Sequence, residues 1–231
     1  MSLILTRALI PYELAARWEA GGRPGFADPY SWHQRSWECF PDLSREAPRD
    51  FLTRIDPKDE CVQLLILSGS TPTRPAWCPD HGWQMKEIDQ ESFFSRNRYH
   101  FSLLANPTRK VRSNEKGELL NNSRRVPVTH REDRINDAGH AQRGLLSWLA
   151  DHGKNAGFTL DESSVKTITR PRQNFVKPAK SGGRRQSGIL HAVDFQGVLT
   201  VTDPLALRLA FATGIGSAKA FGFGMLCLSP I

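Results

Sequence analysis

The chain has 231 residues, 39% of them hydrophobic and 24% charged, a composition typical of a globular protein with one large domain or two small ones. No apolar run is as long as a membrane-spanning helix requires, and residues 2–10, which include Arg7 and no cleavage site, predict a first strand rather than a signal peptide. The net charge of +7 favours a polyanionic partner such as nucleic acid and gives no reason to expect a membrane.

The first half of the chain predicts strands around one well-marked helix. That helix begins at Asp28-Pro29, because Asp suits the N-cap and Pro suits the first helical position. The proline-rich stretch 71–83 predicts a loop or a broken helix. Candidate strands occupy residues 2–10, 51–55, 62–67, 83–88 and 99–105.

The second half begins with a polar, charge-rich crossing segment, residues 106–136. A helix is expected over 137–152 and another from Asp203-Pro204, with a short apolar strand at the C-terminal end. Two longer strands, 165–176 and 189–201, flank a basic tip.

The order of elements in both halves resembles β-α-β-β-α-β, the ferredoxin-like unit, with a loop or broken helix at the second helix position of the first half and no well-marked first strand in the second half. We predict an α+β protein made of two tandem ferredoxin-like (RRM-like) domains, with a glycine-rich loop near the C-terminus. The expected division is an N-terminal domain at 1–105, a crossing segment at 106–136 and a C-terminal domain at 137–231.

Four cysteines are scattered along the chain without a CxxC pair: Cys39, Cys61, Cys78 and Cys227. This distribution predicts free thiols and a reducing, cytoplasmic location rather than a disulfide framework. Cys78 and His81 could begin a zinc site, but no second pair completes a tetrahedral ligand set. We therefore expect neither a metal nor a small-molecule cofactor.

A glycine-rich stretch, residues 214–224, lies between the last predicted helix and the last strand. Its spacing, GxGxxKxxGxG, matches neither the P-loop nor the dinucleotide fingerprint, since both of those motifs open a helix. Backbone N–H groups in such a loop can bind phosphate oxygens, and Lys219 would add a mobile positive charge. The alternative is a turn that only tightens the end of a sheet.

The predicted hairpin contains no acidic residue between Ser163 and Val193, but it carries seven basic ones: Lys166, Arg170, Arg172, Lys177, Lys180, Arg184 and Arg185. Each can neutralise one phosphate, and an arginine can also form paired hydrogen bonds with a phosphate or a base edge. A solvated basic hairpin is the alternative, but solvated surfaces usually mix both charges. We interpret this hairpin as an arm that contacts nucleic acid.

His33 is the sharpest candidate for chemistry, because Tyr30, His33 and Trp37 fall on one face of the predicted helix. Cleavage of RNA by its own 2′-hydroxyl needs a base, an acid and cations, and histidine titrates in the range that suits acid or base. Tyr30 could hydrogen-bond the nucleophile or a phosphate oxygen. From spacing alone, a histidine without a chemical role is the alternative.

Three separated motifs resemble one known family. The segment Tyr30-Ser-Trp-His33-Gln-Arg-Ser-Trp37-Glu-Cys-Phe40-Pro41 is similar to the YxxHxxxWxxFP signature of the CasE family, the CRISPR repeat-RNA endoribonucleases of type I-E systems. Leu104-Ala-Asn-Pro-Thr108 followed by Lys110 resembles that family's central segment. Residues 197–203 with 214–224 resemble its C-terminal strand and glycine loop.

The resemblance implies two ferredoxin-like domains and a metal-independent endoribonuclease. Such an enzyme cuts precursor CRISPR RNA at the base of the repeat stem-loop, leaves a 2′,3′-cyclic phosphate and a 5′-hydroxyl, and stays bound to the mature RNA with the other Cascade subunits. The resemblance assigns the catalytic roles to His33 and Tyr30. It also implies RNA contacts by the basic hairpin and by Gly214, Gly216, Lys219, Phe221, Gly222 and Gly224.

Two other functions remain open from the sequence. One is a catalytically idle RNA-binding subunit of the same fold, in which His33 only contacts the stem. The other is a basic protein–protein scaffold. In the endoribonuclease, the fold is expected to bring His33 and the glycine-rich loop to one cleft between the domains.

Overall fold

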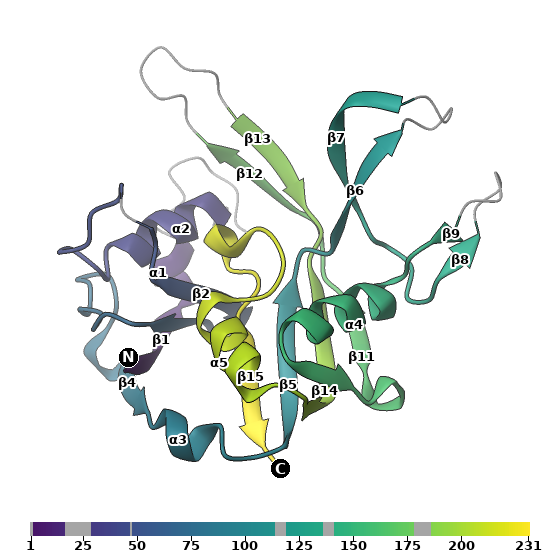
Figure 1. Ribbon diagram of the computed structural model, residues 1–231. Coiled ribbons are helices and arrows are strands. Elements are labelled where there is room, and N and C mark those ends of the chain that lie inside the picture. The colour runs from purple at the N-terminus through teal and green to yellow at the C-terminus, as the bar shows by residue number, and fades with distance from the viewer. Residues whose placement is uncertain (1, 17–28, 47, 114–118, 136–140, 178–185) are drawn as a thin grey trace.

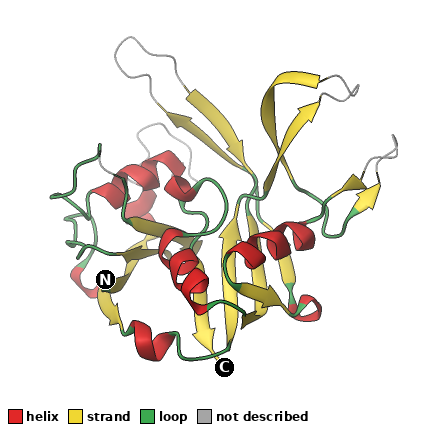
Figure 2. Cartoon of the chain, in the orientation of Figure 1, coloured by secondary structure: helices red, strands yellow, loops and turns green. Residues whose placement is uncertain are grey.

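The computed structural model describes residues 2–16, 29–46, 48–113, 119–135, 141–177 and 186–231. Two antiparallel sheets lie side by side, with helices on their faces, and three two-stranded hairpins project beyond them (Figure 1). Figure 2 shows that strands dominate the described chain and that its helices are short. Among the described residues, no helix has both the length and the apolar character required to cross a membrane.

The first sheet has the strand order β2–β3–β1–β4, the order of a ferredoxin-like unit. Its strands are β1 Leu3–Pro11, β2 Phe51–Pro57, β3 Cys61–Ser68 and β4 Trp83–Ile88. Two helices, α1 Tyr12–Ala16 and α2 Pro29–Trp37, follow β1. Where the second helix of the unit would stand, the chain forms only a 3₁₀ turn, η1 Asp80–Gly82, as the prolines of this stretch led us to expect.

The second sheet repeats this order as β10–β14–β5–β15. Its strands are β5 Arg98–Ala105, β10 Phe158–Leu160, β14 Val193–Val201 and β15 Leu226–Pro230, with β11 Lys166–Thr169 also paired to β14. Its two helices are α4 Leu145–Asn155 and α5 Pro204–Thr213. Short turns complete the chain: α3 Gln90–Phe93, η2 Glu162–Ser164 and η3 Lys219–Phe221. The prediction of two tandem ferredoxin-like units is confirmed.

The division between the two units differs from the predicted one. The sequence assigned the strand at 99–105 to the N-terminal domain, but β5 pairs along its length with β14 and β15. It is therefore the first strand of the second unit, and β4 closes the first sheet. Local sequence shows that a segment is a strand, but it does not show a pairing partner that lies about a hundred residues further along the chain.

Two of the three hairpins form the polar crossing segment. They pair β6 Thr108–Ser113 with β7 Leu119–Pro127, and β8 Arg134–Ile135 with β9 Ala141–Gln142. Both are insertions between β5 and α4. Helix α4 consequently begins at Leu145 rather than at residue 137, and the Asp133 carboxylate accepts a hydrogen bond from the N-cap Gly144 N–H at 2.6 Å.

The third hairpin is β12 Gln173–Lys177 with β13 Gln186–Leu190, and we call it the arm. The sequence predicted one long hairpin here. The structure divides it into a lower pair within the sheet, β11 with β14, and the projecting arm above it (Figure 1). Pro171 lies at the break, since proline has no N–H for a strand ladder.

Helix caps agree with the sequence where the structure describes them. Helix α2 begins at Pro29 as predicted, although Asp28 lies outside the described residues. At the start of α5, the Asp203 carboxylate accepts hydrogen bonds from the N–H groups of Leu205 and Ala206 at 2.9 and 3.0 Å.

The first sheet is buried on both faces, which explains the continuous apolar run of β3. Val62, Leu64 and Ile66 pack in one core with Trp32 of α2. Their neighbour Leu67 points to the other side and joins the core of the second sheet. The two units therefore share an apolar interface, which fixes α2 relative to the second unit.

Candidate active site

Helix α2 is anchored by its two tryptophans and presents His33 away from the sheet. Trp32 and Trp37 are 2% and 8% exposed and pack on the first sheet, whereas Tyr30 and His33 are half-buried. The ring centroids of Tyr30 and His33 lie 6.2 Å apart, and those of His33 and Trp37 lie 6.4 Å apart. Tyr30, His33 and Trp37 therefore lie on one face of the helix as predicted, but Trp37 packs in the hydrophobic core.

The glycine-rich loop lies directly against this helix. The rings of His33 and Phe221 have centroids 6.2 Å apart in an edge-on arrangement. Phe221 in turn stacks on Phe175 of the arm, with centroids 4.5 Å apart and planes inclined by 27°. His33 thus lies where the helix, the loop and the arm meet, and the expected proximity of His33 and the loop is found.

The loop owes its shape to its glycines, all four of which have positive φ angles between 77° and 88°. Gly224 is the most constrained, because a Cβ atom there would lie 2.6 Å from the carbonyl oxygen of Ile215. The Gly224 N–H donates to the Leu104 carbonyl, and the Ile215 N–H donates to the Gly224 carbonyl, both at 2.8 Å. These bonds fasten the loop to β5 and close it on itself.

Asn106, directly after β5, joins the loop to the root of the arm. Its Oδ1 accepts a hydrogen bond from the His191 N–H at 3.0 Å, and its Nδ2 donates to Ser217 Oγ at 3.3 Å. Ser217 Oγ donates back to the Asn106 carbonyl at 3.1 Å. Asn106 is 7% exposed, so its role is to position other residues. Its place in the central motif was the signal that could have identified it.

Two cations lie close together beside the loop. Burial lowers the pKa of Lys219, and the positive charge of Arg49 lowers it further. Burial also lowers the pKa of Arg49, to about 10, and its guanidinium carbon lies 5.1 Å from the centroid of the Phe51 ring. Among the described residues, no carboxylate forms an ion pair with either cation, and Arg49 Nη1 is buried without a hydrogen-bond partner.

Two neighbouring cations that have no carboxylate partner in the described part of the chain make a candidate anion site. The sequence analysis missed Arg49, because it stands alone between Pro48 and Asp50, outside any basic run. Its one visible signal was its place just before β2, the strand that contacts the loop at η3.

Arg170 has a different environment from the one that the basic hairpin suggested. It donates from Nη2 to Asp56 Oδ1 at 2.8 Å and to Asp194 Oδ2 at 2.5 Å. Arg54 donates from Nε to Asp56 Oδ2 at 2.7 Å and from Nη2 to Asp194 Oδ2 at 3.2 Å. Two arginines and two aspartates thus form a charge-balanced network across the sheets, with Arg170 at the root of the arm.

The other basic residues of the hairpin are dispersed. Arg172 is exposed at the root of the arm, and Lys177 ends β12. Lys166 is exposed on β11, which lies on the opposite side of Figure 1 from α2. Three of the predicted contacts lie outside the described residues: Lys180, Arg184 and Arg185.

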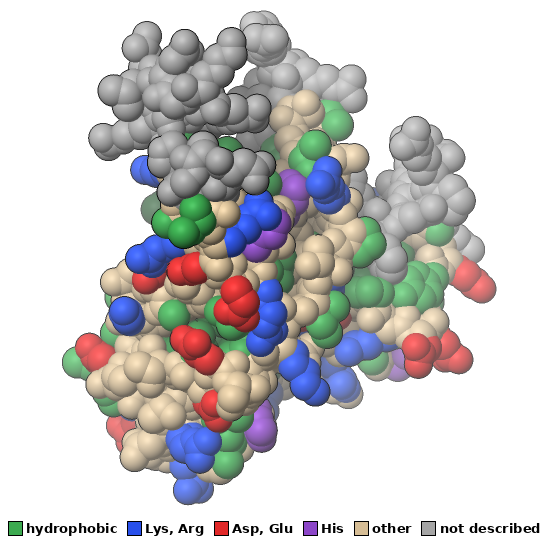
Figure 3. Space-filling view, turned by 90° about the vertical axis from the view of Figure 1, so that its right-hand side faces the viewer, with side chains coloured by type: hydrophobic (Ala, Val, Ile, Leu, Met, Phe, Trp, Pro, Cys, Tyr) green, Lys and Arg blue, Asp and Glu red, His purple; other side chains and the backbone are tan. Residues whose placement is uncertain are grey.

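The surface of one side of the molecule agrees with a charged upper region. On the face shown in Figure 3, histidine and basic side chains lie together in the upper part, and both acidic and basic side chains are spread over the middle and lower parts. The upper end carries the projecting hairpins (Figure 1). Basic side chains are therefore present near the hairpins, but they are not confined to that region.

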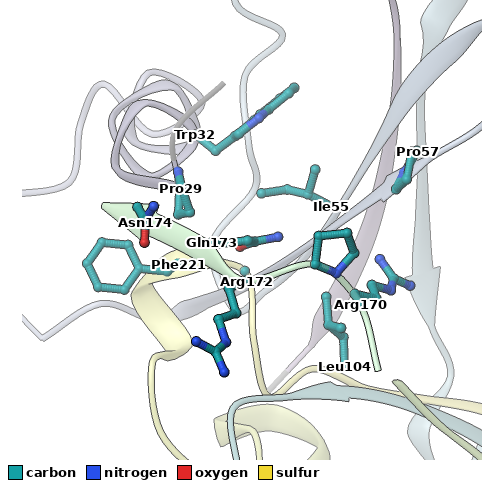
Figure 4. Close-up of a pocket in the computed structure, with 12 residues that line it drawn as sticks. Pro29, Trp32, Ile55, Pro57, Leu104, Arg170, Arg172, Gln173, Asn174 and Phe221 are labelled. Atoms are coloured by element: carbon teal, nitrogen blue, oxygen red, sulfur yellow. The ribbon is translucent and has the colours of Figure 1, made fainter. Parts of the chain in front are cut away.

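A cavity of about 340 Å³ opens between α2, β2, the loop and the root of the arm (Figure 4). Its apolar lining is formed by Pro29, Trp32, Ile55, Pro57, Leu104 and Phe221. The polar side chains at its edge are those of Arg170, Arg172, Gln173 and Asn174. Two of the lining residues are neighbours of His33: Trp32 directly precedes it in the chain, and the Phe221 ring contacts the His33 ring. The cavity therefore adjoins His33, the candidate catalytic residue.

The described residues contain no cluster of three or more His, Cys, Asp or Glu side chains suited to a metal ion. The four cysteines are free thiols, and burial raises the pKa of Cys39 to about 12 and that of Cys78 to about 11. These two thiols are therefore protonated and unreactive near neutral pH.

Fold and site together define a class: a tandem ferredoxin-like protein with a histidine and an anion site at the junction of its two units. A model of the CRISPR associated protein family matches residues 5–230. The chain is 30% identical over 209 residues to the CRISPR system Cascade subunit CasE of Escherichia coli K12, an alignment that covers 88% of this chain and 93% of that protein. The chain belongs to the CasE family of CRISPR-associated proteins, as its three motifs indicated.

A second relative is the CRISPR-associated endoribonuclease Cse3 of Thermus thermophilus, which is 24% identical over 216 residues covering 90% of this chain and 93% of that protein. A solved structure of Thermus thermophilus Cse3, bound to an RNA representing a pre-cleavage complex, has a TM-score of 0.65 at 24% identity and covers 100% of both chains. This likeness confirms the fold.

Proposed function

We propose that the chain is an endoribonuclease that cuts precursor CRISPR RNA at the base of the repeat stem-loop. The observation that carries the proposal is the position of His33, which lies beside the glycine-rich loop and the arm. The half-buried cations Arg49 and Lys219, which form no ion pair with a carboxylate among the described residues, lie at the same loop. A proton-transferring group and an anion site at one junction are what phosphodiester cleavage requires.

The reaction is a transesterification within the RNA. The 2′-hydroxyl before the scissile phosphate loses its proton to a base and attacks phosphorus, the bond to the 5′-oxygen breaks, and an acid protonates that oxygen. The products are a 2′,3′-cyclic phosphate and a 5′-hydroxyl. Because the nucleophile belongs to the RNA, the step needs no metal.

His33 supplies the acid or the base, and Tyr30 hydrogen-bonds the nucleophile or a phosphate oxygen. Lys219 and Arg49 stabilise the charge that develops on the phosphorane oxygens. The loop follows the RNA backbone at its half-buried part around Gly216. Gly214, Gly222 and Gly224 shape the loop instead, because the N–H groups of Gly214 and Gly224 are bonded to carbonyls within the protein and Gly222 is buried. The arm, with Arg172, Lys177 and the basic residues of its tip, contacts the stem.

After cleavage, the protein keeps its product and joins the other Cascade subunits; membership of Cascade is what the name of the Escherichia coli relative states for that protein. We place this activity in the cytoplasm, where thiols such as its four free cysteines stay reduced.

Single-turnover cleavage of the cognate repeat RNA in EDTA tests the mechanism. Wild type should cut once at the base of the stem, and His33→Ala should slow the cut by about 10²–10⁴-fold, the usual contribution of acid–base catalysis. His81→Ala, which changes an exposed histidine of η1, is the matched control and should cut at the wild-type rate.

Equal rates for His33→Ala and wild type, or no cleavage by wild type in EDTA, would contradict the mechanism. Tight binding of the repeat RNA without any cyclic-phosphate product would instead identify the idle RNA-binding subunit. If the affinity for a protein partner changes neither with salt concentration nor after RNase treatment, the chain would instead be a protein–protein scaffold.

A further inference from the structure

The cavity beside His33 has walls suited to a flat, largely apolar group. Trp32 of α2, Ile55 of β2 and Phe221 of the loop line it from three separate elements, and Leu104 lines it from β5 (Figure 4). Its volume of about 340 Å³ is at the small end of the range for ligand pockets. A single base fits such a space, whereas a paired stem does not.

The charge at one side of the cavity is already neutralised. Arg170 lines it, but its guanidinium donates to Asp56 and Asp194, which Arg54 also contacts. The two positive and two negative charges of this network balance. Asp56 keeps its negative charge near neutral pH, because hydrogen bonds and charges from Arg54 and Arg170 outweigh burial and hold its pKa below the usual value. A neutral occupant therefore suits the interior better than a phosphate does.

The edge of the cavity differs from its interior. Arg172 is exposed and, among the described residues, forms no ion pair with a carboxylate. Its guanidinium points in a different direction from that of Arg170 (Figure 4). The side-chain amides of Gln173 and Asn174 carry the donors and acceptors that can read a base edge.

We propose that this cavity receives one unpaired nucleobase of the RNA, from a nucleotide next to the scissile phosphate. This inference rests on the proposed endoribonuclease function. The base packs between Phe221 and the apolar wall, Gln173 and Asn174 contact its edge, and Arg172 binds the adjoining phosphate. Extracting this base from the stack orients the 2′-hydroxyl and the phosphate against His33.

The test uses synthetic repeat RNAs in which the nucleotide on either side of the scissile phosphate is replaced, one at a time, by an abasic ribose. Affinity is measured with a 2′-deoxy substitution that blocks cleavage, and single-turnover rates are measured with the ribose intact. At one of the two positions, the abasic RNA should bind wild type about tenfold more weakly, the loss expected for one stacked base.

Ile55→Trp fills the cavity and should reduce that tenfold difference to less than twofold, because the base no longer enters. Ile168→Trp, at a half-exposed isoleucine of β11, is the matched control and should keep the tenfold difference. If thermal unfolding shows that Ile55→Trp is not folded, Gln173→Ala replaces it and should flatten the preference among the four bases at that position.

Equal affinity of wild type for intact and abasic RNAs at both positions would overturn the proposal. A tenfold difference that persists in folded Ile55→Trp, or a base preference unchanged in Gln173→Ala, would also overturn it. RNA that binds but is not cut would contradict the endoribonuclease function alone, because the affinity comparison would still decide the cavity. Absence of RNA binding would overturn both.

Discussion

At the scale of single residues, the cations beside His33 distinguish this junction from an ordinary interface between domains. Buried cations usually have a carboxylate partner, because an uncompensated charge is costly in the interior. Arg49 and Lys219 are half-buried and have no such partner among the described residues. Burial lowers the pKa of each, and the positive charge of Arg49 lowers that of Lys219 further. The protein therefore maintains an unfavourable arrangement that a bound phosphate would relieve.

Arg49→Ala should slow single-turnover cleavage by about 10²-fold, the usual loss when one donor to a developing oxyanion is removed. Arg49→Lys should recover part of that rate, since lysine keeps the charge but loses the paired N–H geometry. Arg96→Ala, at an exposed arginine before β5, is the control. Cleavage by Arg49→Ala at the wild-type rate would remove Arg49 from the site.

At the scale of elements, the glycine-rich loop works by its fixed shape. Its positive φ angles and its bonds to β5 place Phe221 against His33 on one side and against Phe175 of the arm on the other. Because the Phe221 ring contacts both, we expect a shift of the loop to move the arm relative to α2.

Gly224→Ala tests this coupling. The new Cβ would lie 2.6 Å from the Ile215 carbonyl oxygen, at a φ of 88° that side chains avoid. We expect a loss of about 1–3 kcal/mol in the free energy of unfolding, together with slower cleavage at saturating RNA. Gly69→Ala, at a glycine whose φ is not positive, should leave both quantities unchanged. Unaltered cleavage by Gly224→Ala would show that the loop tolerates displacement.

At the scale of the whole molecule, the network of Arg54, Asp56, Arg170 and Asp194 joins the two units. Asp56 lies near the end of β2 in the first sheet, Asp194 lies on β14 in the second, and Arg170 contacts both. The side chains of Arg54 and Asp194 are each only 6% exposed, so the interaction is weakly screened. We infer that Arg170 orients the arm rather than contacting RNA.

Asp56→Asn should lower the free energy of unfolding by about 3 kcal/mol at pH 7, because it leaves a buried positive charge uncompensated. The pKa of Asp56 is lowered in the folded state, so its stabilisation is complete above the unfolded pKa and is lost as the pH falls through the folded value. The difference between variant and wild type should therefore shrink below about pH 4.

Urea unfolding at pH 7 and pH 3 measures this difference. Asp59→Asn, in the exposed turn before β3, is the matched control and should match wild type at both values. A deficit for Asp56→Asn that stays constant between pH 7 and pH 3 would show that the carboxylate charge of Asp56 does not carry the stabilisation.

The sequence by itself determined the local elements and the chemical candidates. The helix starts at Pro29 and Pro204 depend on a few neighbouring residues, so they were predicted correctly. The motif around His33 and the glycine spacing are also local, and the structure brings His33 and the glycine-rich loop together.

Only the tertiary structure decided which sheet β5 joins and which of the described cations are neutralised by a carboxylate. These properties depend on contacts between residues far apart in the chain, such as β5 with β14, Arg49 with Lys219, and Arg170 with Asp56. A basic residue appears the same in sequence whether its partner is a buried carboxylate or a phosphate. The fold pairs Arg170 with Asp56 and Asp194, and it brings Arg49 close to Lys219 in the proposed phosphate site.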